Sequence, residues 1–185
     1  MASFVCEETG IEGLKIISPI VAEDHRGYFL KSFEKNLLKN IGIDLNVTEI
    51  NESKSSKGVL RGLHMQKEYP QAKLIRVLEG EIYDVAVDLR KDSPTFGQWR
   101  GVILSRENRK MYYVPKGFAH GFLALSEQVV ITYTCDGEYV PEDEKGLIWN
   151  DEDLKIDWPL ERVEEVILSE KDKKWSTYKE FCELK

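Results

Sequence analysis

The chain has few cysteines, no long apolar run and no excess of positive charge. Its 185 residues include three cysteines, Cys6, Cys135 and Cys182, which are odd in number and have no CxxC spacing. This pattern disfavours a disulfide framework and a zinc knuckle. The net charge is −7, and nucleic-acid binding is not expected because neutralising phosphates requires a basic surface. No apolar run reaches the roughly 18 residues that span a bilayer, so no membrane partner is expected either.

The chain also lacks internal repeats, low-complexity tracts and Pro/Ser/Gly-rich linkers. We therefore expect one domain that covers residues 1–185. The first eight residues contain neither the basic segment nor the apolar block of a signal peptide. On this basis we expect a cytoplasmic protein.

Short β-type segments recur at regular spacing through the middle of the chain. After apolar runs and turns over residues 14–31, the pattern from 47 to 134 is β throughout. Such spacing is typical of an antiparallel sandwich or barrel. Residues 118–125 are apolar at both odd and even positions, so we expect this strand to be covered on both faces, by the opposite sheet and by another segment or subunit. The clearest predicted strands are 72–78, 81–88, 98–104, 111–114, 119–125 and 129–134.

Helical patterns are confined to short segments. Residues 34–41 place three apolar side chains on one face, and Gly42 is suited to the C′ position. Residues 168–175 also look helical, with Ser169 as a possible N-cap. The sequence therefore predicts a mainly β protein with a short helix after the N-terminal strands and short C-terminal helices.

Two of the three histidines lie inside apolar, strand-like segments. His64 ends a G-x5-H pattern that begins at Gly58, and His120 ends the P-x-G-x-x-H pattern of residues 115–120. These two patterns resemble the cupin motifs and indicate a jelly-roll barrel whose interior both histidines face. Metal-binding cupins have a second histidine where this chain has Gln66. Because a first-row metal site normally uses about three or more protein ligands, we expect no metal.

Without a metal, His64 is either a core histidine with its hydrogen bonds satisfied or a general base that needs a carboxylate partner. Arg61, Gln66 and Lys73 are also polar groups in apolar strands, which is costly unless they are used. On a regular strand Arg61 and His64 point to opposite faces. Both reach one cavity only if Gly62 marks a bulge or a strand end.

Long contiguous stretches of the chain resemble the dTDP-4-dehydrorhamnose 3,5-epimerases, which belong to deoxysugar biosynthesis. The resemblance extends from Asp24 to Trp175. It rests on DHRGYF (24–29), GVLRGLHMQ (58–66), KLIRVLEGEIYDVAVDLRKDSPTFGQW (73–99), VPKGFAHGFLALS (114–126), WNDEDLKIDWP (149–159) and LSEKD (168–172).

The resemblance implies a nucleotide-linked 4-keto-6-deoxyhexose as substrate, in which the ketone acidifies the hydrogens on C3 and C5. His64 matches the family's base, and Asp172 matches the aspartate that orients it. Lys73 matches the lysine near the developing enolate oxygen. Tyr133 matches the tyrosine that delivers a proton from the opposite face. Taken singly, Lys73 could be a solvated lysine, Tyr133 a core aromatic and Asp172 a helix N-terminal carboxylate.

The resemblance also implies how the substrate is held and how the chain assembles. Arg26 and Arg61 match arginines that bind the diphosphate, and His120 with Asp84 matches a second His–Asp pair in the pocket. The family needs no metal and no redox cofactor. It forms homodimers that exchange an N-terminal strand, so Arg26 is expected to serve the neighbour's site. Further expected substrate-binding residues are Asn51, Gln66, Glu49 and Lys31.

Three departures from the family pattern lie where the family holds the nucleotide and the sugar's surroundings. This chain has Lys31 where a glutamate is usual, Glu49-Ile50-Asn51 where Gln-Asp-Asn is usual, and Ala22 where an aromatic residue is frequent. A carboxylate at 49 repels an anionic ligand unless it is paired, for which Lys31 is a candidate. We therefore expect the proton chemistry to be kept while the nucleotide or sugar preference differs. The alternatives are an epimerase for C3 only, a non-catalytic sugar-nucleotide-binding cupin and a metal-dependent cupin oxygenase.

Overall fold

The structure is a computed structural model that describes residues 4–183, so the ends of the predicted domain, 1–3 and 184–185, lie outside it. The strands are β1 (Val5–Glu8), β2 (Lys15–Ser18), β3 (Ile20–Asp24), β4 (Gly27–Lys31), β5 (Val47–Ser56), β6 (Leu60–Gln66), β7 (Ala72–Glu79), β8 (Glu81–Asp88), β9 (Trp99–Ser105), β10 (Met111–Val114), β11 (Phe118–Ala124), β12 (Gln128–Asp136) and β13 (Glu144–Gly146). The helices are α1 (Lys35–Asn40) and α2 (Tyr178–Glu183), with 3₁₀ helices η1 (Pro141–Asp143), η2 (Leu160–Arg162) and η3 (Asp172–Lys174).

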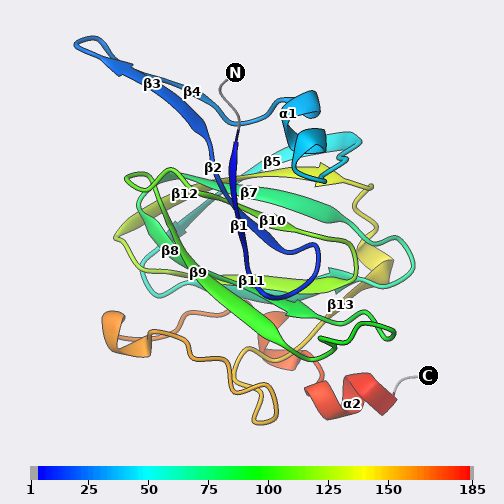
Figure 1. Cartoon of the computed structure of the whole chain (residues 1–185). Helices are drawn as coiled ribbons and strands as arrows, with labels where there is room; N and C mark the ends of the chain where they lie inside the picture. Colours follow the sequence, from blue (N-terminus) through cyan, green and yellow to red (C-terminus); the bar gives the residue numbers. More distant parts are fainter. Residues whose placement is uncertain (1–3, 184–185) are drawn as a thin grey trace.

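Two antiparallel sheets face each other across the body of the molecule (Figure 1). One sheet has six strands in the order β1-β2-β10-β7-β12-β5, and the other has five in the order β13-β6-β11-β8-β9. Neighbours in each sheet are mostly distant in sequence, as crossing between the layers of a jelly roll requires. The mainly β, cupin-type jelly-roll prediction is confirmed.

The core between the sheets follows from the alternation of side chains along each strand. Ile75 and Val77 of β7 and Ile131 of β12 point inward from the six-stranded sheet, while Ile82 of β8 and Phe122 of β11 point inward from the other. All five are at most 2% exposed. Burying an aliphatic or aromatic side chain contributes roughly 1.5–3 kcal/mol, so this layer holds the two sheets in fixed positions on either side of any cavity between them.

Strand β11 is buried along its whole length, as its two-sided apolar pattern predicts. Its inner face packs against the opposite sheet. Its outer face is covered by the C-terminal segment, through Leu147, Leu154 and Trp158. Figure 1 shows this segment, in orange and red, beneath the five-stranded sheet. The second cover is therefore a segment of the same chain.

Helix α1 confirms the prediction over 34–41. The Glu34 side chain accepts hydrogen bonds from two backbone N–H groups of the first turn, which is an N-cap arrangement. Gly42 follows the helix with a φ of +80°, which a residue without a Cβ adopts readily. Leu38 is buried with Leu74 and Met111 on the outer face of the six-stranded sheet, so the helix covers part of that face.

The predicted helix over 168–175 is wrong in extent. Only the three residues of η3 are helical there, and they form a 3₁₀ turn. Ser169 nevertheless acts like a cap, since its Oγ accepts a hydrogen bond from the Asp172 backbone N–H at 3.1 Å. The Asp172 side chain then turns into the molecule and is only 3% exposed. The three-residue turn is therefore enough to bury the Asp172 carboxylate, and no longer helix forms here.

Candidate active site

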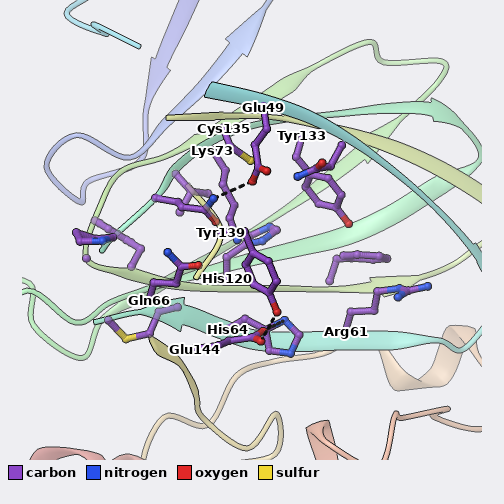
Figure 2. A pocket seen from close by; sticks show the side chains of 18 of the residues that line it. Glu49, Arg61, His64, Gln66, Lys73, His120, Tyr133, Cys135, Tyr139 and Glu144 are labelled. Atoms are coloured by element: carbon purple, nitrogen blue, oxygen red, sulfur yellow. Dashed lines mark hydrogen bonds and ion pairs between the residues drawn. The ribbon is translucent and has the colours of Figure 1, made fainter. Parts of the chain in front are cut away.

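A cavity of about 460 Å³ lies between the two sheets (Figure 2). Side chains from β5, β7 and β12 form one wall, and side chains from β6 and β11 form the opposite wall. The segment after β12 and the segment around η3 contribute further lining residues. The volume falls in the range of roughly 300–1,000 Å³ that small-molecule sites occupy.

His64 lies on β6 and is bonded to a carboxylate. Its Nε2 lies 2.5 Å from Asp172 Oδ1, and its side chain is 25% exposed. Since an ionised carboxylate only accepts hydrogen bonds, Nε2 carries the proton and Nδ1 carries the lone pair. Nδ1 is 3.7 Å from Glu144 Oε1 and forms no hydrogen bond to the described residues. The imidazole is therefore set up to accept a proton at Nδ1.

Asp172 is held in its ionised form by the groups around it. Burial alone would raise its pKa, but the hydrogen bond and charge of His64, and the hydrogen bond from Ser169 Oγ at 2.9 Å, hold the pKa below its ordinary value. A carboxylate that stays ionised orients the imidazole and stabilises the imidazolium that forms when His64 takes a proton.

Tyr133 approaches the cavity from the other sheet. It lies on β12, and its hydroxyl shares a hydrogen bond of 2.8 Å with Ser53 of β5. Burial raises the pKa of Tyr133 to about 12, so the phenol keeps its proton at neutral pH. Figure 2 shows Tyr133 and His64 on opposite sides of the cavity. A molecule bound between them meets a base on one face and an acid on the other.

Lys73 of β7 brings its amine into the same cavity. Burial lowers its pKa, while Cys135, Glu144 and Glu49 oppose that change. Cys135 is its register partner on β12. The amine forms no ion pair with any residue of the described range. A fixed positive charge in a pocket is suited to stabilising an oxyanion that develops during a reaction.

A second His–Asp pair lies beside the first. His120 on β11 is the register partner of His64 on β6, and its Nε2 is 2.7 Å from Asp84 Oδ1. Asp84 is completely buried, and its Oδ2 has no hydrogen-bond partner in residues 4–183. Burial raises the pKa of Asp84, although His120 and Lys73 oppose the change. This pair therefore differs in environment from His64–Asp172.

A family model described as dTDP-4-dehydrorhamnose 3,5-epimerase matches residues 8–180. This chain belongs to the dTDP-4-dehydrorhamnose 3,5-epimerase family. A dTDP-4-dehydrorhamnose 3,5-epimerase of Methanothermobacter thermautotrophicus is 51% identical over 180 residues, which are 97% of each chain. The resemblance expected from the sequence is therefore confirmed, and the family is one of isomerases.

Solved structures of related epimerases agree with this assignment. A dTDP-6-deoxy-D-glucose-3,5-epimerase from Legionella pneumophila, in complex with dTDP-4-keto-L-rhamnose, is 48% identical with a TM-score of 0.90, over 94% of this chain and 92% of that one. A 3′-monoepimerase from Streptomyces bikiniensis, in complex with dTDP-quinovose, is 34% identical with a TM-score of 0.83, over 91% of this chain and 85% of that one. The fold thus occurs in enzymes named for one inversion and for two.

Within this epimerase fold, Arg61 and His64 reach one cavity because β6 is irregular. The pairing of β6 with β11 shifts register between Phe122, opposite Arg61, and His120, opposite His64. The bulge expected at Gly62 is present. The Arg61 guanidinium donates to Ser55 Oγ at 3.1 Å and to the Lys54 carbonyl at 3.2 Å, which aims it along the wall formed by β5.

Three predicted binding residues of the epimerase line the cavity, and they differ in how many of their polar atoms are already hydrogen-bonded within the protein. Asn51 lines it from β5. The Gln66 amide is fully used, because it donates to two backbone carbonyls and accepts from the Val140 N–H at 2.8 Å. Gln66 therefore shapes the loop beyond β12. Glu49 accepts a hydrogen bond of 2.9 Å from Gln71.

Arg26 and Lys31 lie outside the cavity of their own chain. Both belong to the β3–β4 hairpin, which pairs only with itself among the described strands and projects from the body (Figure 1). Arg26 is bonded to Asp24 at the hairpin tip. Within this chain Lys31 does not pair with Glu49, because Glu49 accepts from Gln71 and Lys31 forms no ion pair with the described residues.

The sequence analysis missed a group of three polar lining residues that contact one another, Glu144, Lys171 and Tyr139. Glu144 Oε2 accepts from Lys171 at 2.7 Å and from the Tyr139 hydroxyl at 2.8 Å. Glu144 lies on β13, which is only three residues long, so no periodic pattern could identify it. Lys171 had one available signal, because it directly precedes Asp172 in the LSEKD stretch.

The described part of the chain offers no cluster of three or more His, Cys, Asp or Glu side chains placed to hold a metal ion. Within the same residues, no helix combines the length and the apolar character required to cross a bilayer.

Proposed function

We propose that this protein epimerises a dTDP-linked 4-keto-6-deoxyhexose at C3 and C5. The observation that carries the proposal is the opposition of His64 and Tyr133 across one cavity, with Lys73 beside them. Inversion at carbon needs a base on one face and an acid on the other. The membership of the epimerase family and the sugar nucleotides named in the related structures support the same substrate class.

The first chemical step is removal of a proton next to the ketone. His64 Nδ1 takes the hydrogen as a proton, the electrons of the C–H bond form a carbon–carbon double bond, and the carbonyl electron pair moves to oxygen. Asp172 stabilises the imidazolium. The Lys73 amine stabilises the enolate oxygen, which carries more charge in the transition state than in the ketone.

The second step returns a proton to the other face of the same carbon. The Tyr133 hydroxyl donates it, the enolate becomes the ketone again, and the configuration is inverted. The raised pKa of Tyr133, about 12, ensures that the phenol is protonated before the step. Solvent then reprotonates the phenolate, and His64 releases its proton. A second cycle inverts the second carbon.

We further propose that the active protein is a homodimer with N-terminal strand exchange. The hairpin leaves Phe29 68% exposed, and the edge strand β5 leaves Ile50 69% exposed. Large exposed apolar groups of this kind favour a partner surface. In such a dimer Arg26 and Lys31 serve the neighbour's cavity. Sedimentation of the wild type and of Phe29→Asp tests this; a monomeric, fully active wild type would contradict it.

The departures at Ala22, Lys31 and Glu49 lead us to propose an altered nucleotide or sugar preference. The test compares kcat/KM for dTDP-, UDP-, CDP- and GDP-linked 4-keto-6-deoxyglucose. The control is a relative that has glutamine at the position of Glu49. If this protein prefers dTDP as strictly as that relative does, the proposal is wrong. The whole chain acting as one catalytic domain, and a cytoplasmic location, remain predictions from the sequence.

The decisive experiment is incubation with dTDP-4-keto-6-deoxyglucose in D₂O. Deuterium at both C3 and C5, read by NMR, is the expected outcome. Label at C3 alone would instead favour the single inversion of the Streptomyces relative. Binding without any label would favour a non-catalytic cupin, and elemental analysis of the purified protein tests the metal-dependent alternative.

A further inference from the structure

Trp175 lies against the catalytic pair and has no role in the steps above. Its indole Nε1–H donates to Asp172 Oδ1 at 3.1 Å. The same oxygen accepts from His64 Nε2 at 2.5 Å. Ser169 Oγ occupies the other oxygen at 2.9 Å. The carboxylate is thus held at both oxygens, and it cannot rotate without breaking the bond to Trp175 as well as the bond to Ser169.

The same indole also contacts the imidazole. The ring centroids of His64 and Trp175 are 5.7 Å apart, with an angle of 67° between the ring planes. This is an edge-to-face arrangement, which aromatic rings favour at such a separation. One side chain therefore touches both members of the pair, at the carboxylate by a hydrogen bond and at the imidazole by ring packing.

The strand next to His64 is shaped to admit this indole. Gly146 of β13 is the register partner of His64. A Cβ on Gly146 would lie 2.5 Å from the Trp175 ring, which is closer than packed atoms can approach. Beyond the indole, the Ser176 carbonyl accepts from the Ile148 N–H at 3.0 Å. The indole therefore lies against Gly146, and the residue that follows it is hydrogen-bonded to the segment after β13.

We propose that Trp175 is a positioning residue, which orients Asp172 and through it the base His64. This inference rests on the proposed function. The indole N–H also withdraws charge from the oxygen that faces the imidazole. Without that donor, Asp172 would place more negative charge on His64 and make its protonation easier.

Other charged groups face His64, and one of them also contacts Trp175, since the Lys171 ammonium lies 5.7 Å from the centroid of the indole ring. Glu144 faces Nδ1 from β13 and is itself bonded to Lys171 and Tyr139. His120 lies across the strand pair on β11. Lys73 and Tyr133 face the cavity from the opposite sheet. Because Trp175→Phe keeps an aromatic ring next to Lys171, a change in the pH dependence of this variant is assigned to the lost hydrogen bond to Asp172.

The test is Trp175→Phe, which keeps an aromatic ring against His64 and Gly146 but removes the donor. We expect kcat to fall about tenfold, which corresponds to about 1.4 kcal/mol. We expect KM to stay within about twofold of the wild type, because Trp175 is not among the residues that line the cavity. The acid limb of the kcat/KM profile should move to higher pH. A residue that only packs would not move this limb.

The matched control is Trp99→Phe. Trp99 is also half-buried, and its Nε1–H donates to the Leu154 carbonyl at 2.9 Å, away from the cavity. We expect this variant to keep the wild-type kcat and pH profile. If Trp175→Phe did the same, the inference would be overturned. If the wild type itself exchanged no deuterium, the proposed function would fail instead.

A second measurement covers the case in which Trp175→Phe does not fold. In the ¹⁵N-labelled wild type, the Trp175 indole N–H resonance should shift with pH along the acid limb of activity, because its acceptor is bonded to His64. The Trp99 resonance should not shift. A Trp175 resonance that is constant across that limb would overturn the inference.

Discussion

The histidines of the two His–Asp pairs are register partners on the adjacent strands β6 and β11, yet their carboxylate partners have opposite environments. Asp172 lies on a 3₁₀ turn and has partners for both oxygens, from His64, Ser169 and Trp175. Asp84 lies in the middle of β8 and has a partner for only one oxygen among the described residues. Burial acts on both, but it prevails only at Asp84.

Each carboxylate is bonded to one histidine, so the difference follows burial and the further hydrogen bonds that Asp172 receives from Ser169 and Trp175. Asp172 has a pKa below the ordinary value of 3.8 and Asp84 has one above it. An ionised partner makes His64 a base that can become a cation. We therefore expect the first pair to perform proton abstraction and the second to hold the pocket wall and the substrate.

The largest expected difference between the pairs is in the histidines themselves. His64→Ala should lower the rate of deuterium exchange by about 10⁴-fold, the upper range for loss of a general base, while dTDP still binds by calorimetry. His120→Ala should lower it by only about tenfold. A deeper loss in His120→Ala than in His64→Ala would reverse the assignment of the base.

Substitution of the two aspartates should give a smaller difference in kcat between the pairs than substitution of the two histidines. Asp172→Asn replaces an acceptor by an amide that can donate to Nε2, which places the ring proton on Nδ1 and removes the base. We expect kcat to fall about 10³-fold. Asp84→Asn should cost less than about tenfold. Steady-state kinetics on both variants measures this, and thermal melts check that each variant is folded. Equal losses of kcat in the two variants would contradict the proposed difference between the pairs.

The Tyr133→Phe variant tests whether the His120–Asp84 pair can donate the proton that completes the inversion. If Tyr133 is the donor, formation of the inverted product should fall about 10²-fold, while deuterium still enters from the side of His64. NMR measures the two rates in one sample. Undiminished product formation in this variant would instead assign the acid role to His120–Asp84.

The smallest expected effect is on stability, and its pH dependence has opposite sign at the two sites. A lowered pKa means that Asp172 stabilises the fold above pH 3.8, and that this contribution is lost as pH falls through its folded pKa. A raised pKa means that ionisation of Asp84 lowers the free energy of unfolding, progressively as pH rises from 3.8 through its folded pKa. Below pH 3.8 Asp84 has no such destabilising effect.

Urea midpoints between pH 3 and pH 7 check these signs. Asp172→Asn should be less stable than the wild type at pH 7, with a gap that closes only below about pH 3.8. Asp84→Asn should be as stable as the wild type or more stable at pH 7, with a gap that shrinks as pH falls. Parallel curves for the two variants would show that the carboxylates do not differ as described.

The strands were predictable from the sequence, because short apolar segments separated by turn residues at regular intervals are typical of antiparallel β structure. The helix at 34–41 and the two-sided burial of β11 followed from the same local rules. The short turn at 172–174 was not predictable as such, because capping signals mark where a helix can begin and not how far tertiary contacts let it run. The position of Glu144 likewise depends on a three-residue strand with no pattern of its own.

The sequence by itself determined the β architecture, the family and the identity of the proton-transfer groups, because these depend on residue type, spacing and contiguous motifs. The family resemblance paired His64 with Asp172, but only the tertiary structure gave the geometry of that pair, whose members are separated by 108 positions along the chain. It also placed Tyr133 on the sheet opposite His64 and brought Trp175 next to Gly146. These relations arise from how two sheets and a covering segment pack, which local residue preferences do not specify.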